Sequence, residues 1–139
     1  MTRAIETYRG FVYPWSIDHV GHMNVQFYVG RFDEASWHFL ARIGLTPSFL
    51  RENRRGLVAL DQRTQYKLEV LSGSLLEIQT ELIELKAKTI RFLHRMLNSE
   101  TNQEVATMDL LVAYIDTDAR KTTPLPEHVQ QMAAALNNT

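Results

Sequence analysis

The sequence has no cysteine in its 139 residues. Disulfide bonds, thiolate metal sites and a cysteine nucleophile are therefore excluded together, and a reducing cytoplasm is the expected location. No apolar run approaches the roughly 18 residues of a membrane-spanning helix. The opening segment MTRAIETYRG also lacks the basic start and apolar core of an export signal. We therefore expect a soluble protein with no membrane association.

The sequence also lacks a large excess of positive or negative charge, because it has 15 basic and 16 acidic residues. A binder of nucleic acid without sequence preference normally carries a strong basic excess, so we expect no nucleic-acid partner. The six glycines are scattered singly, which excludes the phosphate-binding loops. No Gly-x-Ser-x-Gly elbow of a serine hydrolase occurs. The length predicts a single domain over residues 1–139 with a real core.

A long amphipathic helix is predicted over residues 25–43. Its apolar side chains recur at steps of three and four, as the buried stripe of a helix does, at Tyr28, Phe32, Ala35, Phe39 and Ile43. Asn24 is a suitable N-cap and Gly44 a suitable residue just beyond the end. In a chain of this size, only a sheet can cover the apolar side of a helix about 28 Å long.

The rest of the chain predicts mainly strands, at residues 5–13, 57–70, 76–82, 90–98 and 105–115. A short helix capped by Thr46 precedes the second strand, and a tail helix begins at Pro126. Along residues 57–70 the apolar side chains alternate with charged ones, but Gln62 and Thr64 interrupt the apolar face. A polar patch, a subunit contact or a passing ligand would each explain the interruption. The expected fold is α+β, with one curved antiparallel sheet around the long helix.

The stretch WSIDHVGHMN at residues 15–24 joins the first strand to the long helix. It brings an acid, two imidazoles and an amide to the start of the helix, where backbone N–H groups are free and the helix dipole is positive. An oxygen that becomes negative during a reaction would be stabilised there. Asp18 is the candidate catalytic group, although an aspartate in a turn often serves only as a cap or an Asx turn.

Two other possibilities concern this region: a metal site, and a role for Glu34 on the helix. A metal site built on Asp18, His19, His22 and His38 is disfavoured, because the histidines do not have helical i, i+4 spacing and no further ligand cluster is evident. We therefore expect no metal. Glu34 on the helix is expected to be a buried structural partner, with a role as the acid as the alternative.

Residues 12–24, VYPWSIDHVGHMN, together with Tyr28 and residues 32–35, FDEA, resemble the D-x-x-G-H-x-N … Y … E-A signature of hotdog-fold thioesterases of the 4-hydroxybenzoyl-CoA thioesterase type. The resemblance implies a hotdog fold, in which a five-stranded antiparallel sheet curls around one long helix, here followed by a short C-terminal helix. It also implies homodimers paired edge to edge, which often pair again as tetramers. The active sites of this family lie between protomers.

By the same resemblance, Asp18 matches the catalytic acid, and the amide near Val25 matches the donor that polarises the thioester carbonyl. His22 and Asn24 match positions that plant-type acyl-carrier thioesterases of this fold also use, but the further asparagine of those enzymes is Val20 here. The residues that the resemblance and the pattern suggest for substrate binding are Trp15, Gly21, Tyr28, Gly56, Gln62 and Thr64, with Gly56 contributed by the partner protomer.

The implied function is hydrolysis of an acyl-CoA thioester, with CoA as part of the substrate and no separate cofactor. Asp18 would act as nucleophile or general base. The sequence pattern YPW … DHVGHMNV is similar to that of thioesterases associated with carnitine breakdown, which suggests betainyl-CoA as a substrate. Three alternatives stay open: a hotdog hydratase or dehydratase, a non-catalytic acyl-CoA-binding protein and a purely structural oligomer.

Overall fold

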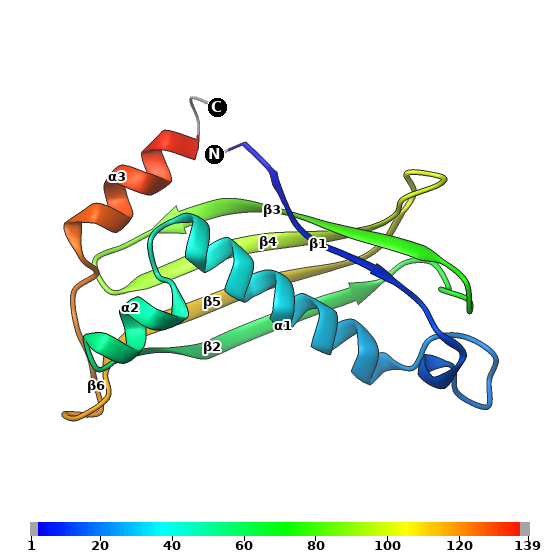
Figure 1. The fold of residues 1–139 in the computed structure, drawn as a ribbon, viewed down its shortest axis with the longest axis horizontal. Coiled ribbons are helices and arrows are strands. Elements are labelled where there is room, and N and C mark those ends of the chain that lie inside the picture. Colours follow the sequence, from blue (N-terminus) through cyan, green and yellow to red (C-terminus); the bar gives the residue numbers. More distant parts are fainter. Residues whose placement is uncertain (1–2, 137–139) are drawn as a thin grey trace.

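The computed structural model describes residues 3–136; residues 1–2 and 137–139, the ends of the predicted domain, lie outside the described residues. An antiparallel sheet in the order β1-β3-β4-β5-β2 curves around the long helix α1, which lies across one face (Figure 1). A short β6 pairs with the end of β5. The strands are β1 (Ile5–Phe11), β2 (Arg55–Tyr66), β3 (Leu75–Leu85), β4 (Thr89–Asn98), β5 (Glu104–Asp116) and β6 (Lys121–Thr122). The predicted hotdog architecture is confirmed, and β6 is an addition that the sequence pattern did not indicate.

Helix α1 spans Val25–Arg42, close to the predicted range. Its predicted apolar stripe is buried against the sheet, and the Phe39 ring lies 4.9 Å from the Phe92 ring on β4, between centroids. The side chain of Asn24 caps the first turn, and Gly44 follows the last turn with φ of 93°. The stripe fixes the rotation of α1 about its axis. The helix begins at the same end of the molecule where β2 ends (Figure 1).

Two short helices lie at the opposite end of the molecule (Figure 1). Helix α2 (Pro47–Glu52) starts at its predicted cap, Thr46, whose hydroxyl accepts the Phe49 N–H at 3.1 Å. Helix α3 (Glu127–Ala135) begins one residue later than predicted, with Pro126 as its N-cap. Strand β1 ends at Phe11, two residues earlier than predicted, because a single 3-10 turn, η1 (Pro14–Ser16), follows it.

The prediction of an apolar face along residues 57–70 is wrong. Between Ala59 and Asp61, β2 shifts its register against β5, leaving Leu60 as an extra residue in a bulge. A bulge reverses the alternation of side chains. Ala59 is therefore on the helix side, opposite Val112, and Gln62 shares that side, opposite the buried Leu110. The strand also ends at residue 66 rather than 70.

Strand β2 forms one edge of the sheet. Its large apolar side chains are open to solvent in the single protomer: Leu60 is 56% exposed, Tyr66 49% and Val58 39%. An exposed, long and apolar edge strand is a template for pairing with another chain. The β2 edge of the single protomer is therefore open to pairing.

One polar group lies at the centre of the core. His94 on β4 is fully buried, with its Nδ1 2.6 Å from Thr80 Oγ1 and its Nε2 2.8 Å from Ser36 Oγ. Ser36 donates its own proton to the Phe32 carbonyl, so His94 Nε2–H donates to Ser36 and Nδ1 accepts from Thr80. Burial lowers the pKa of His94 to about 3, so the imidazole is neutral and fully hydrogen-bonded.

Candidate active site

The turn before α1 is held by its own backbone. Asp18 N–H donates to the His22 carbonyl at 3.2 Å, and Gly21 N–H donates to the Asp18 carbonyl at 3.0 Å. Gly21 has φ of 100°, a conformation that favours glycine. Met23 N–H donates to the Val70 carbonyl at 2.7 Å, which ties the turn to the segment after β2. The turn therefore places Asp18 directly in front of the first turn of the helix.

The Asp18 carboxylate accepts two hydrogen bonds, one on each oxygen. Asn24 Nδ2 donates to Oδ2 at 3.0 Å, and Val20 N–H donates to Oδ1 at 2.9 Å. These two bonds, that of Asn24 first, hold the pKa of Asp18 below its ordinary value, with smaller contributions from His22 and His19. The carboxylate is therefore ionised at neutral pH, and each oxygen keeps a lone pair that is free to react.

The first turn of α1 supplies donors next to this carboxylate. Asn24 Oδ1 accepts the Gln26 N–H at 3.1 Å, so one side chain caps the helix and holds Asp18. The Val25 N–H begins the helix and has no intrahelical acceptor. Within residues 3–136 it donates to no other group. It is a free donor at the positive end of the helix dipole.

These groups line one cavity of about 380 Å³. Its walls come from the turn and α1 on one side and from the end of β2 on the other, and they are formed by Asp18, His22, Met23, Asn24, Val25, Tyr28, Tyr66, Lys67, Leu68 and Glu69. The four predicted catalytic positions and Tyr28 are thus brought together. His22 is half-buried, with its Nδ1 3.5 Å from the Met23 carbonyl oxygen. The arrangement offers a carboxylate and a backbone donor to one bound group.

Residues 66–69 are members of this wall that sequence reasoning missed. The Tyr66 ring meets the Tyr28 ring edge to face, with centroids 5.0 Å apart and planes at 88°. Lys67 is ion-paired with Glu104 on β5. These residues lie about forty positions after the motif, and no local pattern marks them. Their place in the wall follows from where β2 ends against α1, which the pairing of β2 with β5 decides.

Of the six suggested substrate-binding residues, only Tyr28 belongs to this wall, and the other five lie outside it. Trp15 is 73% exposed and stacks flat on Tyr13, with centroids 4.5 Å apart. Gly21 shapes the turn. Gln62 lies further along β2, in a second cavity of about 370 Å³ between α1 and the sheet, where Asp33 and Ser36 also lie. Thr64 is half-buried on the helix side of the strand, between Gln62 and Tyr66.

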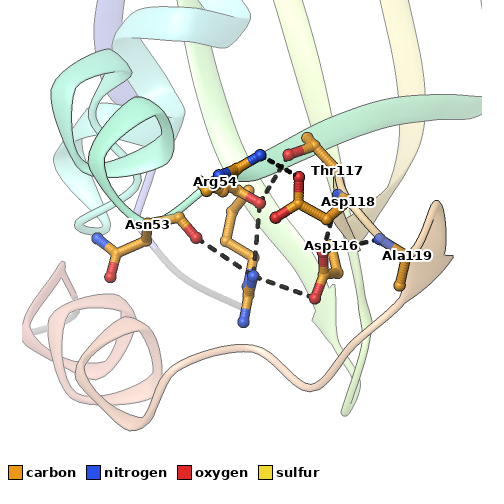
Figure 2. A network of polar contacts seen from close by, with 7 residues as sticks. Asn53, Arg54, Asp116, Thr117, Asp118 and Ala119 are labelled. Atoms are coloured by element: carbon orange, nitrogen blue, oxygen red, sulfur yellow. Dashed lines mark hydrogen bonds and ion pairs between the residues drawn. The ribbon is translucent and has the colours of Figure 1, made fainter.

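Gly56 lies at the opposite end of β2 from Tyr66. Figure 2 shows how this end is fixed: the turn before β2 is tied to the turn after β5, with Arg54 paired to Asp118. Arg55 pairs with Asp116 at 3.3 Å. Within one protomer, Gly56 therefore cannot reach Asp18, and its predicted role depends on a partner.

Other expectations concern charged groups. Glu34 is exposed on α1, so the expectation of a buried partner is wrong. In the described part of the chain, no three His, Asp or Glu side chains gather where they could hold a metal ion. Over the same residues, no helix is both long enough and apolar enough to cross a membrane.

Comparisons with known proteins show which family the chain resembles over most of its length. A family model, that of the thioesterase-like superfamily, matches residues 12–132. A betainyl-CoA thioesterase from Pseudomonas aeruginosa is 24% identical over 98% of this chain and 86% of its own length. An L-carnitine dehydrogenase/betainyl-CoA thioesterase from Agrobacterium fabrum is 27% identical over 87% of this chain, a match that spans only 25% of that longer protein.

A solved structure shares the fold over nearly the whole chain. A hypothetical protein from Staphylococcus aureus, in complex with CoA, superposes with a TM-score of 0.90 at 18% identity, covering 99% of this chain and 86% of that one. At this identity the likeness establishes the architecture alone.

Proposed function

The chain belongs to the thioesterase-like superfamily and is a thioester hydrolase, and we propose that Asp18 and the first turn of α1 carry out the hydrolysis of an acyl-CoA. One observation carries the proposal. The ionised carboxylate of Asp18 and the free N–H of Val25 line the same cavity at the helix start. A nucleophile or base therefore lies beside a donor that can take the negative charge of a carbonyl oxygen.

The chemistry needs few groups. The thioester carbonyl oxygen accepts the Val25 N–H, and Asp18 either attacks the carbonyl carbon or removes a proton from an attacking water. In the first case the C–S bond breaks, CoA leaves as a thiolate, and water then hydrolyses the mixed anhydride. In the second case water forms the new C–O bond directly, the C–S bond breaks, and CoA leaves as a thiolate while Asp18 holds the proton taken from the water and later releases it. The leaving thiol has a pKa of about 8.5, so no strong general acid is required.

Asn24 and His22 have supporting roles in this proposal. Asn24 fixes the orientation and charge of the Asp18 carboxylate through its amide, and fixes the helix start through its oxygen. His22 forms part of the cavity wall and orients the substrate. Both therefore act as positioning residues rather than as proton donors in the bond-breaking step.

The proposed active unit is a homodimer that pairs through the free edge of β2. An antiparallel pair centred on Gln62 sets Asp61 of each protomer opposite the partner's Arg63, so the edge is self-complementary in charge. The same register brings the partner's Gly56 to the Tyr66 end of β2, beside the cavity. Pairing also covers the exposed apolar side chains of the edge. A further pairing to a tetramer stays a prediction from the family resemblance.

The proposed substrate is betainyl-CoA. Two relatives are named as betainyl-CoA thioesterases, and the sequence pattern YPW … DHVGHMNV supports the same substrate. The test is to give the purified protein short, long, aromatic and betainyl-CoA thioesters and to follow the release of free thiol. Turnover of at least one of them is the expected result. Cleavage of none, with or without binding, would overturn the proposal and favour an acyl-CoA-binding protein or a hydratase.

A further inference from the structure

The wall of the cavity opposite Asp18 contains two tyrosine rings, Tyr28 and Tyr66. Tyr28 and Tyr66 meet at nearly a right angle, so neither face of the ring that presents its edge is covered by the other ring. Tyr28 is buried at 5% exposure, whereas Tyr66 is 49% exposed in the protomer. Tyr66 is therefore not a core residue of the protomer: it lines the cavity, and the rest of its surface is open until β2 pairs with its partner.

The side chains around the cavity carry a net negative charge. Three charged side chains line it: Asp18, Lys67 and Glu69. The Lys67 ammonium is already neutralised by Glu104, whereas Glu69 has no ion pair within residues 3–136. Burial is the main cause that raises the pKa of the Tyr28 hydroxyl, and the nearby Tyr66 and Glu69 add to it. The Glu69 carboxylate therefore lies close to the Tyr28 hydroxyl, and Tyr28, Tyr66 and Glu69 together form one corner of the cavity.

A group that fits this corner carries a positive charge and has no N–H to donate. Aromatic faces attract cations, and recognition of quaternary ammonium groups by tyrosines is a common use of that attraction. Three other wall residues, Met23, Val25 and Leu68, are apolar and suit methyl groups. The two aromatic rings and these apolar side chains present mainly apolar surface, which favours a methylated ammonium over a primary one.

The distance along the helix limits the acyl chain. Tyr28 follows Val25 by three residues, a rise of about 4.5 Å, and helical side chains lean back toward the N-terminus. The Tyr28 ring therefore covers the turn that holds the Val25 N–H. A cation against this ring would therefore lie close to the carbonyl that accepts this N–H, which favours a short link between the two groups.

We propose that Tyr28, Tyr66 and Glu69 form a binding site for a quaternary ammonium group attached one carbon from the thioester carbonyl. The site selects a trimethylammonioacetyl thioester over neutral acyl groups of the same shape. This inference rests on the proposed thioesterase function and names the residues that give it specificity.

The decisive comparison uses two substrates of equal shape. Betainyl-CoA and 3,3-dimethylbutanoyl-CoA differ only in the replacement of the ammonium nitrogen by carbon. We expect wild-type kcat/KM to favour betainyl-CoA by at least about tenfold. Glu69→Gln should reduce kcat/KM for betainyl-CoA about fivefold to tenfold and leave the neutral substrate unchanged. The control Glu100→Gln, in the exposed β4–β5 loop, should change neither.

The contribution of the aromatic ring to ammonium binding is tested with two substitutions at Tyr66. Tyr66→Phe keeps the π-face and should retain the preference, whereas Tyr66→Leu should lose it. Calorimetric titration with tetramethylammonium chloride, against potassium chloride at equal ionic strength, gives a readout that does not depend on turnover. Wild type should bind the ion, and both Glu69→Gln and Tyr66→Leu should bind it more weakly.

The outcomes separate the two proposals. If wild type and Glu69→Gln cleave both substrates with the same ratio and neither binds tetramethylammonium, the ammonium site is wrong and the thioesterase function stands. If tetramethylammonium binds at Glu69 and Tyr66 but no thioester is cleaved, the ammonium site stands and the proposed hydrolysis fails.

Discussion

Asn24 Nδ2 lies 3.0 Å from Asp18 Oδ2, while the oxygen of the same amide accepts the Gln26 N–H at 3.1 Å. One side chain thus joins the helix start to the candidate nucleophile. The cap needs an acceptor and the Asp18 contact needs a donor, so the two tasks of Asn24 can be separated by substitution.

Replacement of the carboxylate is the first prediction. Asp18→Asn keeps the size of the side chain but cannot attack or accept a proton as a carboxylate does. We expect kcat/KM for the best acyl-CoA to fall at least about a hundredfold, measured by thiol release. Glu100→Gln, which likewise replaces an exposed carboxylate by its amide but lies in the β4–β5 loop, should stay near wild type. A variant at position 18 as fast as wild type would contradict the mechanism.

The second prediction concerns pH and Asn24. The Asn24 amide is the largest cause of the lowered pKa of Asp18. Asn24→Ser keeps a cap of similar strength but removes the amide donor, so the pKa of Asp18 should rise toward its ordinary value of about 3.9. The acid limb of the kcat/KM profile should therefore move to higher pH, with thermal stability nearly unchanged. Coinciding acid limbs for the two proteins would show that this bond does not control the charge of Asp18.

The third prediction links His94 to stability. In the unfolded chain a histidine has a pKa of about 6.5, whereas burial lowers the pKa of His94 to about 3 in the folded state. Below pH 6.5 the unfolded state therefore binds more protons, and stability is lost as the pH falls. The free energy of unfolding should decrease by up to about 1.4 kcal/mol per pH unit between pH 6 and 4.5.

Denaturant titrations of wild type and His94→Gln at several pH values measure this slope. His94→Gln should be less stable at pH 7, because the hydroxyls of Ser36 and Thr80 lose a well-placed partner, but its stability should depend less on pH over that window. His38→Gln, on an exposed face of α1, serves as the control. Equal slopes for wild type and His94→Gln would show that the buried imidazole does not titrate as expected.

The fourth prediction tests the β2 edge. Leu60 is 56% exposed in its bulge, so Leu60→Glu should leave the protomer stable but place a charge in the proposed dimer contact. Sedimentation velocity should then show monomer where wild type is dimeric, and activity should fall with dissociation because the site loses its neighbour. Leu75→Glu, a similarly exposed position at the start of β3, should remain dimeric. A dimeric and active Leu60→Glu variant would exclude pairing through this edge.

Much of the fold and part of the site could be predicted because their causes are local. The apolar stripe, the Asn24 cap and the Gly44 end define α1 within twenty residues. The turn from Asp18 to Asn24 closes through its own backbone and side chains, so the nearness of the carboxylate to the helix start is encoded in one short stretch. The family signature lies in that stretch for the same reason.

The other wall of the site could not be predicted, because tertiary structure alone decides it. The bulge at Leu60 reverses the faces of β2, and no residue type in that strand announces it. Tyr66 and Glu69 reach the cavity only because β2 pairs with β5 and ends beside α1. His94 has the appearance of any polar residue in a strand, yet burial keeps its imidazole neutral, and hydroxyls from α1 and β3 decide which ring nitrogen carries the proton.

The sequence by itself determined the helix, its caps and the acid that precedes it, since hydrogen bonds between near neighbours need no other part of the chain. Tertiary structure decided which faces of the strands turn inward and which distant side chains share the cavity. The physical reason is that strand register and burial depend on contacts between segments far apart in the chain, where a shift of one residue turns a side chain from the core to the solvent.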